Sequence, residues 1–419
     1  MQTPINTLSN NKTLLVIALV WPEPASTAAG VRMMQLLDVF KTQGYAITIA
    51  SAASKSQFSF DFHSLGFKME DIKMNDCSFD VFVKKLNPSV VLFDRFLTEE
   101  QFGWRFVEQC PDALRILDTE DLHSLRHVRE QCFKKDIPFT TEAWIADDKT
   151  KREIASIYRC DLSLIISSFE LELLTNVIKI DKSLFLLLPF MVDEITNNTK
   201  WKTFEDRNGF IFIGGGKHAP NIDAIKLLKT SIWPLIHAQL PEAKLHIYGA
   251  YLPQQVLEMH DPKERFLVKG RAEDADEAMQ SAKVCLAPLR FGAGIKGKLV
   301  AAMQNGTPSV TTTLGAEGMH GILDWNGSIE NDPNAFVDAA VHLYTDKTIW
   351  SRAQEQGKTL INTLYSKTSL EKILITAIDE LQRNLPQHRQ HNFIGALLQH
   401  QTLQSTKFMG KWIEAKNRG

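Results

Sequence analysis

The chain has 419 residues, of which 44% are hydrophobic and 23% are charged, and its formal net charge is -2. This length favours two domains over a single core. The near-neutral charge argues against a nucleic-acid-binding protein, which needs a basic field. The five cysteines are scattered without a C-x-x-C spacing, which predicts reduced thiols rather than zinc or redox chemistry.

The polar start, residues 1–12, lacks the charged-then-apolar layout of a secretory signal. The longest apolar runs, residues 14–21 and 184–192, are shorter than the roughly 20 residues that span a bilayer. We therefore expect a cytoplasmic protein without a transmembrane helix. Peripheral contact with the inner membrane face stays open, because an amphipathic surface leaves no such run.

Strand and helix patterns alternate through the first half of the chain. The buried-strand pattern LLVIALV (residues 14–20) precedes a helical pattern over residues 31–42, which Gly44 ends. YAITIAS, VVLFD, LRILD and LSLIISS follow, with helical segments between them. Continuous apolar strands joined by helices are typical of a parallel sheet covered on both faces. Residues 1–195 are therefore predicted to form a Rossmann-like domain.

A polar stretch at residues 195–208 marks the predicted domain boundary. The second set of strands is GFIFIGG, KLHIYGA, RFLVKGR, AKVCLAPL and PSVTTT. We predict an α/β protein with two doubly wound parallel sheets, the second over residues 196–385, and a ligand cleft between them at the carboxyl ends of the strands. The tail, residues 386–419, is predicted to be either a docking helix or a frayed end.

The most informative segment is APLRFGAGIKGKLVAAMQNGTPSVTTTLGAEGMHG, residues 287–321. Three glycines follow a strand and precede a helix, so backbone N–H groups can approach an anion at the positive end of the helix dipole. Lys296 and Lys298 add full positive charges, and Gly294 lies just before them. A diphosphate is the ligand expected there. The alternative is a tight turn with solvated lysines.

This segment resembles the nucleotide-binding region of group 1 retaining glycosyltransferases, which have the GT-B fold, in a GAG-x-KGK form. FIGGGKHAPNIDAI (residues 212–225) resembles the strand, loop and helix that open their second domain. The resemblance implies that Gly214, Gly215 and Gly216 approach the donor and that Lys217 or His218 contacts phosphate or sugar. Asn221 is expected to cap the helix.

The first domain carries three further resemblances. ALVWPEPASTAAGVRM (residues 18–33) resembles the acceptor-side glycine loop, with Gly30 and Arg32 at a helix start, and ISSFELELL resembles an S-x-x-E segment. DTEDLHSLR resembles the D-x-x-D-x-H segment that faces the cleft, which implies a catalytic His123 and an acceptor-side Asp118. Either aspartate of this segment positions His123 or caps the helix, and the alternative for His123 is a histidine bonded to its neighbours.

This sequence lacks two carboxylates that members of the family usually have. The paired glutamates of retaining members align with Ala293 and Ala301, and alanine cannot bind a hydroxyl group. Glu317 is expected either to contribute a donor-binding carboxylate or to cap a helix. Arg290 either binds phosphate or pairs within its domain.

The acidic run EDADE (residues 273–277) contains a D-x-D, which binds metal in another glycosyltransferase fold. It also starts a predicted helix, whose dipole stabilises acidic residues without a ligand, so no metal is expected.

The resemblance implies an enzyme of polysaccharide biosynthesis. It would move a sugar from a nucleotide-diphosphate-sugar donor to a glycan, lipid-linked or protein acceptor, with retained anomeric configuration, and without a cofactor. Closure about residues 192–208 is expected to exclude water. The alternative is a catalytically silent GT-B subunit that acts as a binding or regulatory partner.

Overall fold

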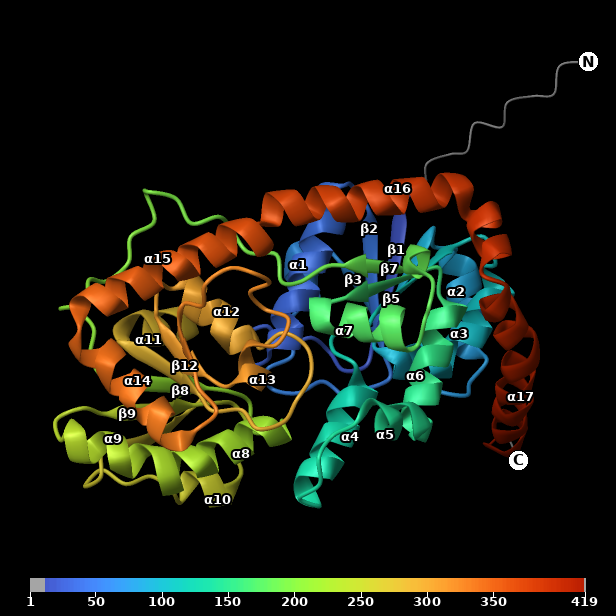
Figure 1. The fold of residues 1–419 in the computed structure, drawn as a ribbon. Helices are drawn as coiled ribbons and strands as arrows, with labels where there is room; N and C mark the ends of the chain where they lie inside the picture. Colours follow the sequence, from blue (N-terminus) through green and yellow to red (C-terminus); the bar gives the residue numbers. More distant parts are fainter. Residues whose placement is uncertain (1–11, 418–419) are drawn as a thin grey trace, which may run out of the picture.

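The computed structural model describes residues 12–417, and residues 1–11, which include most of the predicted non-secretory start, lie outside them. The described chain forms two α/β domains side by side, each built on one parallel sheet (Figure 1). This is the predicted fold.

The first sheet has seven strands in the order β3-β2-β1-β4-β5-β6-β7. Its strands are β1 (Thr13–Ala18), β2 (Ala46–Ser51), β3 (Lys68–Asp71), β4 (Val90–Asp94), β5 (Leu114–Asp118), β6 (Leu162–Ile165) and β7 (Phe185–Leu187). Its helices are α1 (Ala28–Thr42), α2 (Ser78–Leu86), α3 (Phe96–Gln109), α4 (His123–Lys134), α5 (Thr141–Ala146), α6 (Asp148–Arg159) and α7 (Ser168–Glu172), with short turns η1 (Phe62–Leu65), η2 (Leu173–Val177) and η3 (Lys182–Leu184).

The second sheet has six strands in the order β10-β9-β8-β11-β12-β13. Its strands are β8 (Phe210–Ile213), β9 (Leu245–Tyr248), β10 (Phe266–Gly270), β11 (Val284–Ala287), β12 (Ser309–Thr311) and β13 (Gly327–Ile329). Its helices are α8 (Ala219–Leu227), α9 (Trp233–Gln239), α10 (Gln254–Leu257), α11 (Ala275–Ser281), α12 (Gly297–Gln304), α13 (Thr313–Ala316), α14 (Pro333–Thr345) and α15 (Lys347–Leu364), with the π-helical turn η4 (Leu228–Ile232) between α8 and α9.

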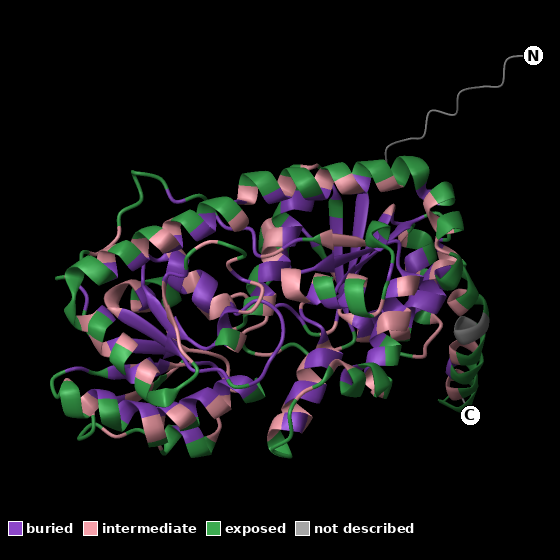
Figure 2. Cartoon of the chain, in the orientation of Figure 1, coloured by how far each residue is buried: buried purple, intermediate pink, exposed green. Residues whose placement is uncertain are grey.

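Every pairing between these strands is parallel, and the central strands are buried along their whole length. Helices on both faces remove the strands from water, as Figure 2 shows by the purple centre of each domain. This arrangement explains why the strands are continuous apolar runs rather than alternating ones.

The last two helices return to the first domain. Helix α16 (Lys367–His391) inserts Leu370, Leu374, Ile378 and Leu385 into the core formed by β1 and α1. Figure 1 shows it leaving the end of α15 and running along the first domain. We expected residues up to 385 to stay in the second domain, and the structure differs because the helical pattern does not show which sheet a helix packs on.

The tail forms helix α17 (Phe393–Asn417), which packs on α3 and α6. A kink at Asn384, close to Pro386, separates it from the straight part of α16. The predicted start of the tail at residue 386 therefore coincides with the bend. Of the two alternatives for the tail, the structure has the docking helix.

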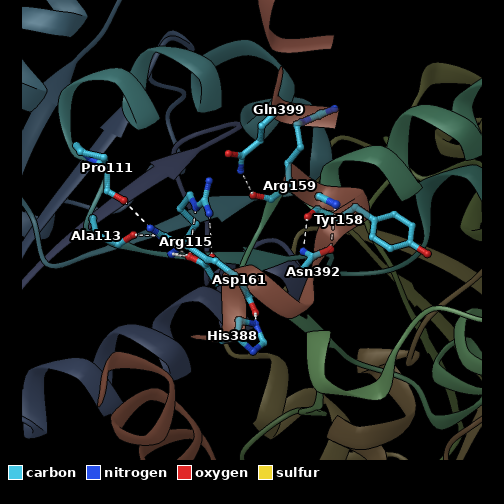
Figure 3. A network of polar contacts seen from close by, with 11 residues as sticks. Pro111, Ala113, Arg115, Tyr158, Arg159, Asp161, His388, Asn392 and Gln399 are labelled. Atoms are coloured by element: carbon cyan, nitrogen blue, oxygen red, sulfur yellow. Dashed lines mark hydrogen bonds and ion pairs between the residues drawn. The ribbon is translucent and has the colours of Figure 1, made fainter. Parts of the chain in front are cut away.

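Polar contacts hold the end of α16 and the start of α17 against the first domain (Figure 3). The Arg389 guanidinium donates to both carboxylate oxygens of buried Asp161 at 2.8 Å, and Arg115 pairs with the same carboxylate at 2.9 Å. Farther along, Asn392 donates to the Tyr158 carbonyl at 2.7 Å and Gln399 to the Arg159 carbonyl at 2.9 Å. These partners lie on the first domain, so the tail is an integral layer of it.

Candidate functional site

The two domains meet at the carboxyl ends of their strands. Arg129 of α4 binds both carboxylate oxygens of Glu317 at 2.7 and 2.8 Å, and it also donates to the Gly292 carbonyl at 2.9 Å. On another part of the interface, the Tyr251 hydroxyl lies 2.9 Å from the Glu23 carboxylate. The domains are therefore in direct contact around the predicted cleft.

The glycine-rich loop before α12 packs against the first domain. Gly294 has φ +64°, and a Cβ there would lie 2.7 Å from the Asp121 Cβ, so only glycine fits. Its N–H donates to the Glu170 carboxylate at 2.8 Å. The predicted phosphate contact from this N–H is therefore replaced by a protein carboxylate. Ala293 packs into the apolar core of the first domain.

Lys296 and Lys298 both lie at the start of α12. Lys296 is buried and donates to the Gly294 carbonyl at 2.7 Å, and Lys298 donates to the Asn221 side-chain oxygen at 2.7 Å. Burial lowers the pKa of each ammonium to about 8. The first N–H groups of a helix have no partner inside it, so two cations and a helix start lie together. A bound anion would favour the charged forms of both lysines and raise these pKa values.

The loop after β8 faces α12. A Cβ on Gly214 would lie 2.6 Å from the Asn221 side chain, and one on Gly216 would lie 2.2 Å from the Tyr251 carbonyl oxygen. Gly215 lies opposite Ser26 of the first domain. These three glycines allow close packing of the loop against protein neighbours, and Gly215 is the most open of them. Their predicted approach to a donor stays a prediction.

Asn221 differs from its expected role as a cap. The N-cap of α8 is His218, and Asn221 lies inside the helix, where its amide donates to the Gly215 carbonyl at 3.0 Å. Since its oxygen accepts from Lys298, Asn221 links the loop after β8 to the lysine of α12. The Lys217 ammonium lies 3.6 Å from the centre of the Tyr251 ring.

The first-domain wall of the site is the start of α4. His123 is half-buried, with its Nε2 3.4 Å from the Asp121 carboxylate, which also pairs with Arg126. Burial lowers the pKa of His123 to about 3, against the opposing charge of Asp121. At neutral pH this imidazole is neutral and suited to hydrogen bonding.

His218 of the second domain lies within electrostatic reach of the same wall. The residue is exposed, and the charges of Arg126 and Asp121 both act on its imidazole. Asp121 thus interacts electrostatically with two histidines, one from each domain.

Two predicted acceptor-side residues lie elsewhere. Arg32 and Asp118 are fully buried and form an ion pair at 2.9 Å, and Arg32 also donates to the Leu188 carbonyl at 2.7 Å. Neither side chain reaches the cleft, and Asp118 does not cap α4. The pair ties α1 to β5, since Arg32 lies on the helix and Asp118 ends the strand. Gly30 lies against Glu23, where a Cβ would be 2.4 Å from the backbone.

The other predicted site residues have hydrogen-bond or ion-pair partners within the protein. Arg290 is exposed and pairs with Asp223 of its own domain at 2.6 Å, which matches the alternative rather than a phosphate contact. Glu317 occupies the C-cap position of α13, which matches the capping alternative, and its carboxylate binds Arg129 of the first domain, a contact that neither alternative included. Within the EDADE run, Asp274 caps α11 and Asp276 accepts from Asn305.

Sequence reasoning missed several residues at this edge. Glu170, from the S-x-x-E segment, accepts from the N–H groups of Leu122 and Gly294, and burial raises its pKa to about 8. Arg95 and Glu120, at the ends of β4 and β5, both have positive φ angles. Their strain was invisible in the sequence, whereas the S-x-x-E match was a usable indication for Glu170.

Among the described residues, no cluster of three or more His, Cys, Asp or Glu could hold a metal ion. None of the helices within residues 12–417 has the length and apolar character needed to cross a membrane.

Comparisons with known proteins agree with this geometry. Residues 207–346 match the family described as glycosyl transferases group 1. A search of curated proteins gives no significant match. The second domain is therefore a group 1 glycosyltransferase domain.

Solved structures show the same fold over the whole chain. Sucrose-phosphate synthase from Thermosynechococcus elongatus has a TM-score of 0.64 at 15% identity, covering 88% of this chain and 99% of that one. The pneumococcal O-GlcNAc transferase GtfA, in complex with UDP and GlcNAc, has a TM-score of 0.66 at 12% identity, covering 89% and 99%. Anabaena Alr3699/HepE, in complex with UDP, has a TM-score of 0.60 at 11% identity, covering 88% and 100%.

At these identities the structural likeness establishes the GT-B fold. Together with the family match over residues 207–346, it supports a glycosyltransferase.

Proposed function

We propose that the protein transfers a sugar from a nucleoside-diphosphate-sugar donor, with the donor diphosphate at the start of α12. The observation that carries this is the pairing of Lys296 and Lys298 with a helix start beside the open Gly215 loop. Buried ammonium groups with lowered pKa values gain most from an anionic ligand. Uridine is the first base to test, because similar proteins are solved with UDP.

In this proposal the transferred sugar lies between His218 and the Asp121–His123 wall. The main barrier is charge developing on the leaving phosphate, which fixed cations stabilise without reorganising, and no metal is needed for that. A neutral His123 can hydrogen-bond a sugar hydroxyl or the reacting centre. We expect retention of anomeric configuration, with a glycan, lipid-linked or protein acceptor bound on the first-domain side.

The carboxylate missing at Ala301 bears on donor binding. This residue lies in the second turn of α12, three residues after Lys298, and its methyl group cannot accept a hydrogen bond from a ribose hydroxyl. The donor must then be held more by its diphosphate than in enzymes with the glutamate. We also place the enzyme in the cytoplasm, since the cysteines of the described residues form no disulfide and four of them are buried.

A binding experiment tests the donor site. The thermal midpoint is measured with UDP, GDP, ADP, CMP and dTDP for the wild type, for Lys298→Ala and for Lys226→Ala, an exposed lysine on α8. A ligand at a hundred times its Kd stabilises by about 2.7 kcal/mol. We expect one nucleotide to stabilise the wild type and Lys226→Ala but not Lys298→Ala. Equal shifts in all three proteins would place the nucleotide elsewhere.

A further inference from the structure

Helix α17 exposes large apolar side chains along its outer face. Phe393, Ile394 and Leu397 near its start are 72%, 48% and 49% exposed, and Phe408 and Trp412 near its end are 64% and 60% exposed. At 3.6 residues per turn, these five side chains fall within about 100° around the helix axis. The two ends of this apolar face, Phe393 and Trp412, are about 28 Å apart along the helix.

The opposite face of α17 accounts for its docking, so the exposed face is not needed for folding. Gly395 and Gly410 are buried against the first domain, and Glu414 binds Arg105 of α3 at 3.2 Å. Figure 1 places α17 on the side of the first domain that faces away from the second, and Figure 2 shows it exposed along its outer edge. An apolar face left open on a docked helix marks a contact with something outside the chain.

Elements beside α17 add further exposed apolar side chains. A Cβ on Gly410 would lie 3.3 Å from the Asn75 side chain, which places the loop before α2 beside the end of α17. Met74 in that loop is 52% exposed and Val81 on α2 is 68% exposed. We call α17 with Met74 and Val81 the tail surface.

The charges of the tail surface are basic. Lys411 and Lys416 are exposed on α17, and Lys84 and Lys85 are exposed on α2. Among the described residues of α17, none of the exposed side chains is acidic. Lys416 lies 5.4 Å from the centre of the Trp412 ring. Aromatic side chains flanked by lysines match the boundary between acyl chains and anionic headgroups.

We propose that the tail surface docks on a membrane that contains anionic lipids, with α17 lying in the plane of the interface. Charge decides between this partner and a second copy of the chain. A symmetric dimer through α17 would bring the two rows of lysines together, whereas anionic headgroups neutralise them. This docking would also hold the glycosyltransferase where lipid-linked acceptors are found, but the binding itself does not depend on the proposed function.

Vesicle co-sedimentation tests the proposal. The whole protein is mixed with vesicles of phosphatidylcholine alone or with phosphatidylglycerol. We expect binding to the anionic vesicles, weakened about tenfold or more in the Phe408→Ser/Trp412→Ser variant. Ile322→Ser, at a fully exposed residue of the second domain, serves as the matched control and should bind as the wild type does. Thermal midpoints check that all variants fold.

A second variant tests the electrostatic part. Lys411→Glu/Lys416→Glu should lose the preference for anionic vesicles by about tenfold or more, since each lysine near a charged surface contributes on the order of 1 kcal/mol. Binding of neither vesicle type, or equal binding of the wild type and the Phe408→Ser/Trp412→Ser variant, would overturn the proposal. A dimer in sedimentation velocity that the same variant dissociates would assign the tail surface to a second copy instead.

Discussion

The two lysines of the α12 start differ from ordinary surface lysines in their protonation. Burial lowers the pKa of Lys296 and Lys298 to about 8, while a bound diphosphate favours their charged forms and raises it again. Proton uptake should therefore accompany nucleotide binding above about pH 8. Below that pH both lysines are already charged, and the affinity should not depend on their titration.

The affinity for the nucleotide should therefore depend on pH. The Kd of the stabilising nucleotide should stay level between about pH 6.5 and 7.5 and rise above about pH 8, by up to about tenfold per pH unit for each titrating lysine. Calorimetry in two buffers of different ionisation enthalpy would report the proton uptake directly. An affinity that is unchanged up to pH 10 would mean that neither lysine meets the diphosphate. The Lys298→Ala variant should show a shallower dependence.

The sequence predicted which residues lie at strand ends, but not which of them face the cleft. The sequence placed Lys296, Lys298, His123 and His218 near the carboxyl ends of strands, where the structure has them. It did not show that Arg32 and Asp118 are buried, because residues next to a sheet edge can point into the core as easily as into the cleft. Their buried pairing depends on contacts between segments 86 residues apart, which no local pattern encodes.

At the scale of elements, the long apolar strands were predicted well and the short ones were not. Strands β1, β4 and β5 are continuous buried runs, which have a clear pattern. The edge strand β3 has the sequence KMED and is largely exposed, and the edge strand β13 is the three-residue segment GSI. Neither has an apolar run, so composition could not reveal them, whereas the edge strand β10, with the sequence FLVKG, was predicted.

The tail helices depend on the Arg389–Asp161 contact. Burial raises the pKa of Asp161, but the charges of Arg115 and Arg389 outweigh this and lower it to about 2. Arg389→Ala removes four hydrogen bonds and leaves the buried carboxylate with one cation.

We predict that Arg389→Ala lowers the free energy of unfolding by about 1.5 to 3 kcal/mol. Arg383→Ala, an exposed arginine on the same helix, should change it by less than about 0.5 kcal/mol. Urea unfolding measures both. Because the folded-state pKa of Asp161 is depressed, its contribution is present above about pH 4 and lost as the pH falls towards about 2. Equal stability of the two variants would show that α17 and α16 dock without this contact.

At the scale of the whole molecule, the domains are held together by few polar contacts. Arg129 is the main one, since it binds Glu317 and the Gly292 carbonyl of the opposite domain. Arg290 makes an equally short ion pair within its own domain and is therefore a matched control.

We predict that Arg129→Ala favours an open arrangement of the domains. Small-angle scattering without ligand should give a larger radius of gyration for Arg129→Ala than for the wild type, and Arg290→Ala should match the wild type. A saturating donor should return Arg129→Ala towards the compact form, because the donor contacts both domains. An unchanged radius in Arg129→Ala would mean that other contacts set the closure.

Glycosyl transfer by this chain is tested most directly by donor turnover. Release of the nucleoside diphosphate from its sugar conjugate is followed for the wild type, Lys226→Ala and Lys298→Ala, with and without cell-extract acceptors. We predict release by the first two, faster with acceptor, and a loss of about 100-fold or more in Lys298→Ala. A wild-type protein that binds the nucleotide but releases none, with or without acceptor, would contradict glycosyl transfer by this chain.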